Sequence, residues 1–263
     1  MSGNAQSVSM PFIAMPAGLA VVIGGSGGIG RVICQKLAQC GADVALSWRS
    51  NEAVARETAA EIAAMGCAAH IGQADLAELD SVITFFAQLA ATGEKISSVI
   101  VATGADISMS YVSEVDPAEW RRVIDGDLNG FFNVTQAALP HLRASSGSLT
   151  ALTSAGIVRH AHRDILSIAP KAAIESLVRA VSREEGRYGV RANSVALGPI
   201  DAGLLHRLAT RVPESFMKAV ASNTALRRAG TAEEAANAAV FLASNAASYI
   251  TGASLTVDGG FSV

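Results

Sequence analysis

Runs rich in β-branched residues alternate with alanine-rich segments along most of this chain. The first runs are LAVVIGG, ADVALSW and SSVIVATG, and they are separated by helix-like pieces such as GRVICQKLAQCG and EAVARETAAEIAAMG. Further strand-like runs follow, namely GSLTALT, VRANSVA and ASLTVDGG. Parallel strands must be joined by crossover connections, which are usually helices. The alternation therefore predicts an α/β fold with one doubly wound parallel sheet and helices on both faces.

The length of 263 residues, half of them hydrophobic, is sufficient to bury the core of one domain. We expect that domain over residues 19–263, preceded by a flexible lead over residues 1–18. The lead contains no Lys or Arg and no uninterrupted apolar stretch, so we do not interpret it as a signal peptide. No later segment supplies the roughly 18 consecutive apolar residues of a membrane span. These features predict a soluble, cytoplasmic protein.

Charge and cysteine content argue against several function classes. The net charge of −3 and the charged fraction of 16% leave no extended basic surface for nucleic acid or for a membrane. The three cysteines, Cys34, Cys40 and Cys67, are odd in number and lack metal-ligand spacing. We therefore expect free thiols, no metal site and a small-molecule substrate.

The sequence VVIGGSGGIGRVI places a glycine-rich turn between the first strand and the first helix. Gly24, Gly28 and Gly30 have no side chain, so the backbone turns tightly and its N–H groups approach a pyrophosphate at the helix N-terminus. The alternative is a turn that serves packing alone. Its place in the first βα unit favours a Rossmann-type dinucleotide site.

The end of the second strand bears on the choice of cofactor. It reads LSWRSN, with Arg49 and Ser50 where an NAD-binding fold has a carboxylate for the ribose hydroxyls. An arginine at this point pairs with a 2′-phosphate, so the sequence favours NADPH over NADH. The alternative is that Arg49 is an ordinary solvated side chain.

Several further motifs follow the glycine turn: the Asp75-Leu76 pair, VATG at 101–104, LGPI at 197–200 and ITGASLTVDGG. Together with GGSGGIG they make the chain, from about Ala20 to its C-terminus, resemble the short-chain dehydrogenase/reductase family. The resemblance implies an NAD(P)H-dependent oxidoreductase with Asp75 and Leu76 beside the adenine and Ile200 at the nicotinamide. The implied cofactor residues are Gly24, Ser26, Gly28, Ile29, Gly30, Arg49, Ser50, Asp75, Leu76, Ala102, Gly104, Lys171, Gly198 and Ile200.

In that family the chemistry usually rests on an asparagine, a serine, and a tyrosine four residues before a lysine. Ser154 and Lys171 match this pattern, whereas Ser167 stands at the tyrosine position and Asp127 at the asparagine position. The resemblance implies that Ser154 donates a hydrogen bond to the substrate oxygen and that Lys171 serves the cofactor ribose and the proton path. Asp127 and Ser167 would then position water.

The missing phenol changes the chemistry that is available. Carbonyl reduction needs a proton donor for the alkoxide, and a serine hydroxyl is a far weaker acid than a phenol of pKa about 10. The 2,4-dienoyl-CoA reductase branch of the family also lacks this tyrosine, and its peroxisomal-type members are similar to this chain in having an aspartate where Asp127 falls. There, hydride goes to a conjugated carbon and the electrons settle on a thioester enolate. The resemblance favours reduction of a conjugated enoyl or dienoyl thioester, with an acyl-CoA as substrate.

Two alternatives remain open at this stage. One is carbonyl reduction of a 3-oxoacyl-type substrate with a relocated acid, for which His160, His162 and Tyr111 are candidates. The basic loop over residues 159–164 would equally suit an anionic group such as a CoA phosphate. The other alternative is an NADPH-binding protein without turnover. Separately, Asp127 has the alternative of being an ordinary solvent-facing helical aspartate.

Two long helices are predicted, from Pro117 to about Arg143 and from Asp164 to about Tyr188. Pro117 suits the first turn of a helix. Pro170 interrupts the second pattern, which predicts that the regular helix begins only between residues 167 and 171.

The segment over residues 203–229 follows the sixth strand and is amphipathic with polar breaks. Its place at the carboxyl end of a strand predicts a substrate lid, and a surface excursion without a moving role is the alternative. The family resemblance also implies a homodimer or homotetramer built on the two long helices and the last strand.

Overall fold

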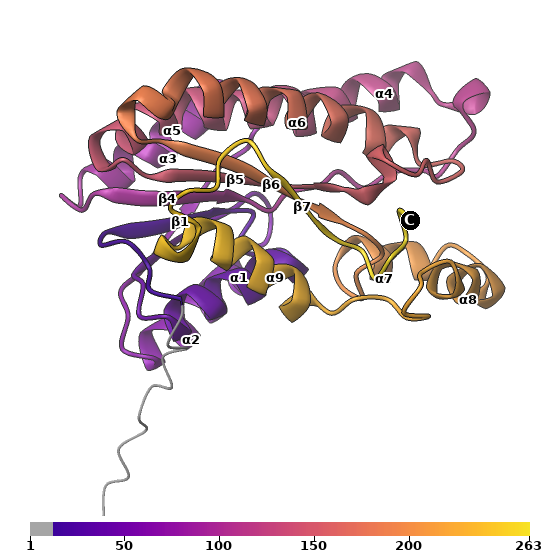
Figure 1. Ribbon diagram of the computed structural model, residues 1–263, viewed down its shortest axis with the longest axis horizontal. Helices are drawn as coiled ribbons and strands as arrows, with labels where there is room; N and C mark the ends of the chain where they lie inside the picture. The colour runs from indigo at the N-terminus through magenta and orange to yellow at the C-terminus, as the bar shows by residue number, and fades with distance from the viewer. Residues whose placement is uncertain (1–12) are drawn as a thin grey trace, which may run out of the picture.

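The computed structural model of the protein describes residues 13–263 and contains one seven-stranded parallel sheet (Figure 1). The strands lie in the order β3-β2-β1-β4-β5-β6-β7. Their bounds are β1 (Leu19–Ile23), β2 (Val44–Trp48), β3 (Ala69–Gln73), β4 (Ile96–Val101), β5 (Ser148–Ser154), β6 (Arg191–Leu197) and β7 (Ser254–Val257). The predicted doubly wound α/β fold is confirmed.

Helices form a layer on each face of this sheet. One layer consists of α3 (Leu79–Ala90), α5 (Gly130–Ser145) and α6 (Ile165–Glu185), and the other of α1 (Gly28–Gln39), α2 (Glu52–Ala64) and α9 (Ala232–Ala243) (Figure 1). The shorter helices α4 (Pro117–Val123), α7 (Leu204–Ala209) and α8 (Glu214–Ser222) lie toward the end of the molecule at which the strands end (Figure 1). Single turns are η1 (Val112–Glu114), η3 (Ala155–Ile157), η4 (Gly186–Tyr188) and η5 (Asn245–Ala247), and η2 (Ile124–Asn129) is π-helical.

Side-chain alternation along β1 explains why both faces of the sheet are covered. Leu19, Val21 and Ile23 belong to the core beneath α3, α5 and α6. Ala20 and Val22 belong to the second core, beneath α1, α2 and α9. Because successive strand residues point to opposite faces, a strand without polar residues needs a helix layer on each side.

The strand order places a topological switch point between β1 and β4. From β1 the chain moves outward through β2 to β3, and from β4 it moves in the opposite direction through β5 and β6 to β7. The loops that follow β1 and β4 therefore diverge to opposite faces at the carboxyl ends of the strands. A crevice at this point is the usual ligand site of an open α/β sheet.

The first predicted long helix is present but contains a π-helical turn. Helix α4 begins at Pro117, passes through η2 and continues as α5 to Ser145. The carboxylate of Asp116 caps its start by accepting the Ala118 N–H at 2.8 Å. The widened turn in η2 was not apparent from the sequence.

The second long helix is also present, but it shows that our interpretation of Pro170 as the start of the regular helix was wrong. Helix α6 begins at Ile165 rather than between residues 167 and 171, and Pro170 lies inside it and is buried. A proline at this place removes one helical hydrogen bond, but the apolar face of α6 packs on the sheet, and tertiary packing of this kind overrides a local propensity. No helix in the described part of the chain has the length and apolar character needed to cross a membrane.

The last part of the predicted lead, residues 13–18, packs against the domain. Ile13 and Met15 contact the core beneath α1, α2 and α9, and the carbonyl of Ala14 accepts the Asn245 N–H at 3.0 Å. The remainder of the predicted lead, residues 1–12, lies outside the described residues.

Candidate active site

The glycine-rich turn after β1 shapes the start of α1 for close approach by a phosphate. Gly24 has a φ of +81°, a left-handed conformation that suits glycine, and its N–H donates to Ser47 Oγ at 3.0 Å. A Cβ on Gly30 would lie 2.1 Å from the Gly24 carbonyl oxygen. Within the described part of the chain no side chain caps the start of α1 at Gly27, so the first N–H groups and the positive end of the helix dipole are suited to bind an anion.

The ends of β2 and β3 hold the residues predicted for the adenosine part of the cofactor. Arg49 and Ser50 follow β2 directly, and both are exposed. The Arg49 carbonyl accepts the Gln73 Nε2–H at 3.0 Å, which ties this turn to β3. Asp75 and Leu76 lie just beyond β3, and Leu76 is buried. These four positions therefore gather at one edge of the crevice.

The ends of β4 and β6 hold the remaining predicted cofactor positions. Ala102 and Gly104 follow β4, and the Ala102 N–H donates to the Ile23 carbonyl at 2.9 Å, which ties the turns after β1 and β4. Gly198 and Ile200 follow β6. The predicted cofactor residues outside α6 thus lie along the carboxyl ends of β1, β2, β3, β4 and β6.

A buried ionic network lies at the centre of the site. Lys171 on α6 donates from Nζ to the Thr103 carbonyl at 2.9 Å, and its Nζ lies 3.4 Å from Asp127 Oδ2. The other oxygen of Asp127 accepts the Ala105 N–H at 2.9 Å. Lys171 is 8% exposed and Asp127 6% exposed. The predicted pair therefore meets, and it binds the loop after β4 to α6.

The π-helical turn explains how Asp127 reaches this network. Asp127 lies inside η2, whereas its neighbour Asp125 is exposed and accepts the Asn129 side chain at 2.9 Å. A π-helical turn changes the angular spacing of the side chains that follow it, and such turns are frequent at functional sites. The alternative that Asp127 is a solvent-facing aspartate is excluded by its burial.

Ser154 and Ser167 lie on the two elements that flank the network. Ser154 ends β5, and its Oγ accepts the Gly156 N–H at 3.1 Å, so its own O–H is left for a substrate oxygen. Ser167 is on α6, one turn before Lys171, and is half-buried. Residues four apart share a helix face, so Ser167 lies on the same side of α6 as the lysine.

The loop between Ser154 and Ser167 does not gather its histidines into a buried site. His160 and His162 are both exposed. The Arg163 guanidinium lies 4.2 Å from the centroid of the Tyr111 ring, a cation–π contact that joins this loop to the loop after β4. Arg163 itself has a φ of +67°, an uncommon conformation for a residue with a side chain.

The segment predicted as a lid forms α7 and α8 and contacts the cofactor turn. A Cβ on Gly28 would lie 2.8 Å from the backbone nitrogen of Gly203, and one on Gly104 would lie 2.9 Å from Leu204 Cδ1. These approaches place the start of the segment over the start of α1 and over the loop after β4.

An ion pair that the sequence did not reveal holds this segment at its far end. Arg211, between α7 and α8, donates two hydrogen bonds to the Asp106 carboxylate, at 3.0 and 2.6 Å. These hydrogen bonds lower the pKa of Asp106 below its usual value. Arg122 donates to the Asp106 carbonyl at 2.7 Å. Sequence spacing gave no signal for a pair 105 residues apart.

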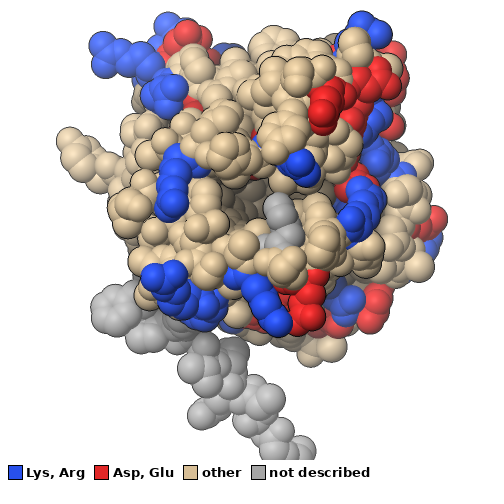
Figure 2. All heavy atoms as spheres, turned by 90° about the vertical axis from the view of Figure 1, so that its right-hand side faces the viewer, with Lys and Arg blue, Asp and Glu red and all other residues tan. Residues whose placement is uncertain are grey.

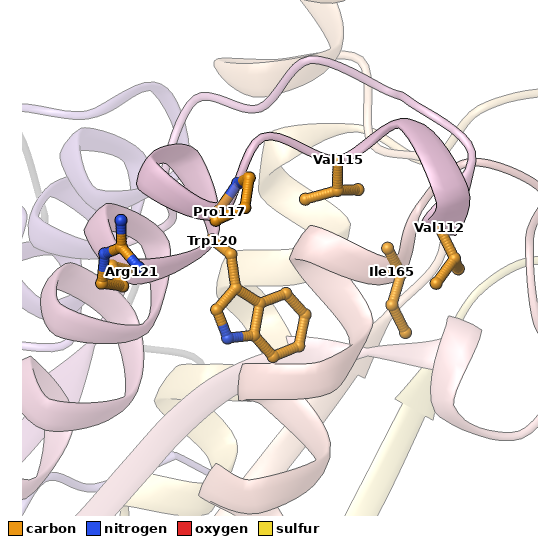
Figure 3. A pocket seen from close by; sticks show the side chains of 6 residues that line it. All are labelled: Val112, Val115, Pro117, Trp120, Arg121 and Ile165. Atoms are coloured by element: carbon orange, nitrogen blue, oxygen red, sulfur yellow. The ribbon is translucent and has the colours of Figure 1, made fainter.

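The surface at this end of the molecule is hollowed. Figure 2 shows a central depression bordered mostly by uncharged side chains, with Lys and Arg side chains around it. A separate apolar cavity of about 260 Å³ lies between η1, α4 and the first turn of α6 (Figure 3). Ile165 lines this cavity, and it lies about 200° around α6 from Ser167, so the cavity is on the opposite side of the helix from the catalytic candidates. Its lining residues are Val112, Val115, Pro117, Trp120, Arg121 and Ile165.

Sheet order, the glycine turn before α1 and the lysine on α6 together define a class, the Rossmann-type proteins that bind a dinucleotide. Within that class, residues 24–262 match the protein-family model described as Enoyl-(Acyl carrier protein) reductase. The chain is 34% identical over 243 residues to the 3-oxoacyl-[acyl-carrier-protein] reductase of Chlamydia muridarum, covering 92% of this chain and 96% of that protein.

Two further comparisons agree with this assignment. The 1-cyclohexenylcarbonyl-CoA reductase of Streptomyces collinus is 31% identical over 245 residues, covering 93% of this chain and 87% of the relative. A short-chain dehydrogenase/reductase of Serratia marcescens, whose structure was solved for a mutant form, has a TM-score of 0.87 at 26% identity, covering 95% of this chain and 99% of that one. The chain belongs to the short-chain dehydrogenase/reductase family and is an oxidoreductase.

Proposed function

We propose that this protein uses NADPH to reduce the conjugated double bond of an enoyl or dienoyl thioester, with an acyl-CoA as the substrate. The observation that carries this proposal is a serine, Ser167, one helical turn before Lys171 of the buried Asp127–Lys171 pair. A serine hydroxyl does not protonate an alkoxide near neutral pH. Conjugate reduction avoids that demand, because its proton goes to carbon after an enolate has formed.

The cofactor assignment is supported by the residues at the crevice. The turn at Gly24 and the uncapped start of α1 fit a pyrophosphate. Arg49 is exposed at the end of β2, where a 2′-phosphate would meet its guanidinium. When bound, NADPH supplies the hydride of the reaction.

The protein side chains then stabilise the negative charge that develops on the substrate. The O–H of Ser154 donates to the thioester oxygen, on which negative charge accumulates as the enolate forms. Lys171 is held by the Thr103 carbonyl and by Asp127, so its position is fixed for the cofactor ribose and for the proton path. Asp127 and Ser167 position water along that path.

The relatives support a thioester substrate, and one of them supports conjugate reduction. The Streptomyces collinus protein is named for a CoA ester whose ring double bond adjoins the carbonyl. The Chlamydia muridarum protein is named a 3-oxoacyl-[acyl-carrier-protein] reductase, and this favours a second candidate function, carbonyl reduction of a 3-oxoacyl thioester. That second function requires an acid elsewhere in the site.

The test is NADPH consumption by the purified protein with a 2,4-dienoyl-CoA, a 2-enoyl-CoA and a 3-oxoacyl-CoA under the same conditions. Turnover of the unsaturated esters alone, with the saturated or partly saturated product seen by mass spectrometry, supports the proposal. Turnover of the 3-oxoacyl ester alone supports the second function. Tight NADPH binding without turnover of any ester supports the non-catalytic alternative. Ser154→Ala is the matched variant, since it removes the substrate hydrogen bond and leaves the cofactor positions unchanged.

We also propose that residues 203–229 act as a substrate lid. The Arg211–Asp106 ion pair and the approach of Gly203 to Gly28 support this role, because both contacts bridge the segment to the rim of the crevice. Protection of the segment from protease cleavage by NADPH and a thioester tests it. Equal cleavage with and without ligands contradicts a moving lid.

We propose that the protein forms a homodimer or a homotetramer. We also propose that it is cytoplasmic. Trp120 on α4, Phe132 on α5 and Leu255 on β7 are exposed apolar side chains on the elements expected to form interfaces. Light scattering of the purified protein at several concentrations tests this, and a monomer at all of them contradicts it.

A further inference from the structure

Asp164, the residue immediately before α6, has a carboxyl group without a hydrogen-bond or ion-pair partner among the described residues. It occupies the N-cap position, but its side chain makes no capping hydrogen bond with the described residues of α6. Its backbone carbonyl instead accepts the Ser167 N–H at 3.1 Å and the Ile168 N–H at 2.9 Å. Aspartate at an N-cap usually accepts a backbone N–H with its side chain, so this carboxyl is held away from its usual partner.

Helix geometry places Asp164 on the catalytic face of α6. Asp164, Ser167 and Lys171 are spaced i, i+3 and i+7, a spacing that places the three residues along one side of the helix, with Asp164 at its N-cap. Lys171 marks that face, because it reaches the Thr103 carbonyl and Asp127. Asp164 lies about 10 Å from Lys171 along the helix axis, at the outer end of the stripe, with Ser167 between them.

No charged group of the described loop and helix around Asp164 pairs with its carboxyl. Arg163 lies over the Tyr111 ring, and Arg159 donates to the Phe261 carbonyl at 2.7 Å. His160 and His162 on the same loop are exposed, and Lys171 is paired with Asp127. Burial raises the pKa of Asp164 to about 7, and no hydrogen bond or ion pair with a described residue offsets it. A helix N-terminus by itself favours the ionised carboxylate, so desolvation is the larger effect here.

Asp127 is less suited to donate a proton. Both of its oxygens already face donors, namely the Ala105 N–H and the Lys171 ammonium. Asp164 has no such partners within residues 13–263 and lies about one helical turn before Ser167.

We propose that Asp164 is the proton donor of this enzyme, acting along the Ser167 side of α6 in place of a tyrosine. This inference rests on the proposed function. The substrate accepts hydride at a conjugated carbon, and its π electrons move to the thioester oxygen. The Asp164 O–H bond then breaks and a C–H bond forms on the enolate, with the Ser167 hydroxyl passing the proton. The balance is one NADPH and one proton consumed, and solvent reprotonates the Asp164 carboxylate.

The experiment compares the pH profile of kcat/KM for the wild type and for D164N. The acid must be protonated, so wild-type activity falls as the pH rises through about 7. D164N is expected to lower kcat by about 100-fold or more and to lose that alkaline limb, with little change in KM. D164E restores much of the rate, and D80N, which changes an exposed aspartate on α3, leaves rate and profile unchanged.

A second background separates proton donation from a structural role. S167Y places a phenol four residues before Lys171, so a new donor becomes available. In that background we expect D164N to lower kcat by less than about threefold, which corresponds to about 0.7 kcal/mol, because the phenol now donates the proton. A smaller loss than in the wild-type background shows that the two residues share one role. Equal losses in both backgrounds contradict proton donation. If S167Y does not fold, the D164E rescue and the pH profile decide the question.

The outcomes also separate this inference from the proposed function. A wild type that turns over unsaturated thioesters beside a D164N variant with the same rate and pH profile contradicts the Asp164 assignment alone. A wild type that binds NADPH but turns over no thioester contradicts both.

Discussion

The two halves of the crevice differ in how they carry function. Around β1 and α1 the important contacts are made by backbone: Gly24 turns with a positive φ, and Gly30 approaches the Gly24 carbonyl more closely than a side chain would permit. Around β5 and α6 they are made by side chains, among them Lys171 and Asp127. A backbone site tolerates substitution wherever a Cβ fits, whereas a side-chain site changes its chemistry with one residue. We therefore expect the half around β1 and α1 to be the less sensitive to side-chain changes, and the half around β5 and α6 to respond to a single residue such as Ser167.

The sharpest test of the backbone half is Gly30→Ala. The new Cβ would lie 2.1 Å from the Gly24 carbonyl oxygen, so the turn must shift. We expect NADPH affinity to fall by at least about 100-fold, or nearly 3 kcal/mol, measured by fluorescence titration. Gly186→Ala is the matched control, because a Cβ there meets nothing within 4 Å and the backbone is helical. Equal affinities for the two variants contradict the backbone account.

The side-chain half predicts a strong coupling between Lys171 and Asp127. Lys171→Met leaves a buried carboxylate beside the Ala105 N–H without its cation, which we expect to cost about 3–5 kcal/mol of unfolding free energy. The double variant with Asp127→Asn should recover most of that loss, because the uncompensated charge is then gone. Urea unfolding of the single and double variants measures both effects. Additive losses show that the two side chains act independently.

Arg49 tests whether side-chain specificity extends to the cofactor. Arg49→Ala removes charge-assisted hydrogen bonds worth about 1.5–3 kcal/mol, so we expect NADPH to bind about 10- to 100-fold more weakly and NADH to bind as before. Arg56→Ala is the control, since Arg56 is an exposed arginine on the following helix that pairs with Glu52. A similar loss for NADH places Arg49 outside the 2′-phosphate site.

The smallest effect is expected where the lid meets the loop after β4. Arg211→Ala breaks the pair with Asp106, and we expect KM for a long-chain thioester to rise about threefold, since exposed pairs contribute little. The pKa of Asp106 is lowered by this pair, so the pair persists above the unfolded pKa of about 3.9 and is lost only in acid. The variant-to-wild-type KM ratio should therefore stay constant between about pH 5 and 8. If the KM ratio changes near neutral pH, a group other than Asp106 makes the contact with the lid.

Two of the unexpected features show what sequence patterns could not predict. Pro170 predicts a late start for its helix, yet α6 begins at Ile165 because packing against the sheet outweighs one missing hydrogen bond. Asp127 looks like one of several polar residues in VIDGDLNG, and only the π-helical turn of η2 gives it a buried place beside Lys171. Local patterns report the periodicity of an element, and a change of periodicity inside an element is invisible to them.

By itself, the sequence determined the sheet, its helix layers and the glycine turn after β1. It could do so because apolar alternation, glycine placement and fixed spacing act within one strand or helix. The tertiary structure alone decided that the Asp164 carboxyl is desolvated without a partner among the described residues, and that Asp106 pairs with Arg211 across 105 residues. Burial and long-range ion pairs depend on which segments come into contact in the folded chain, and local sequence spacing does not show which distant segments do so.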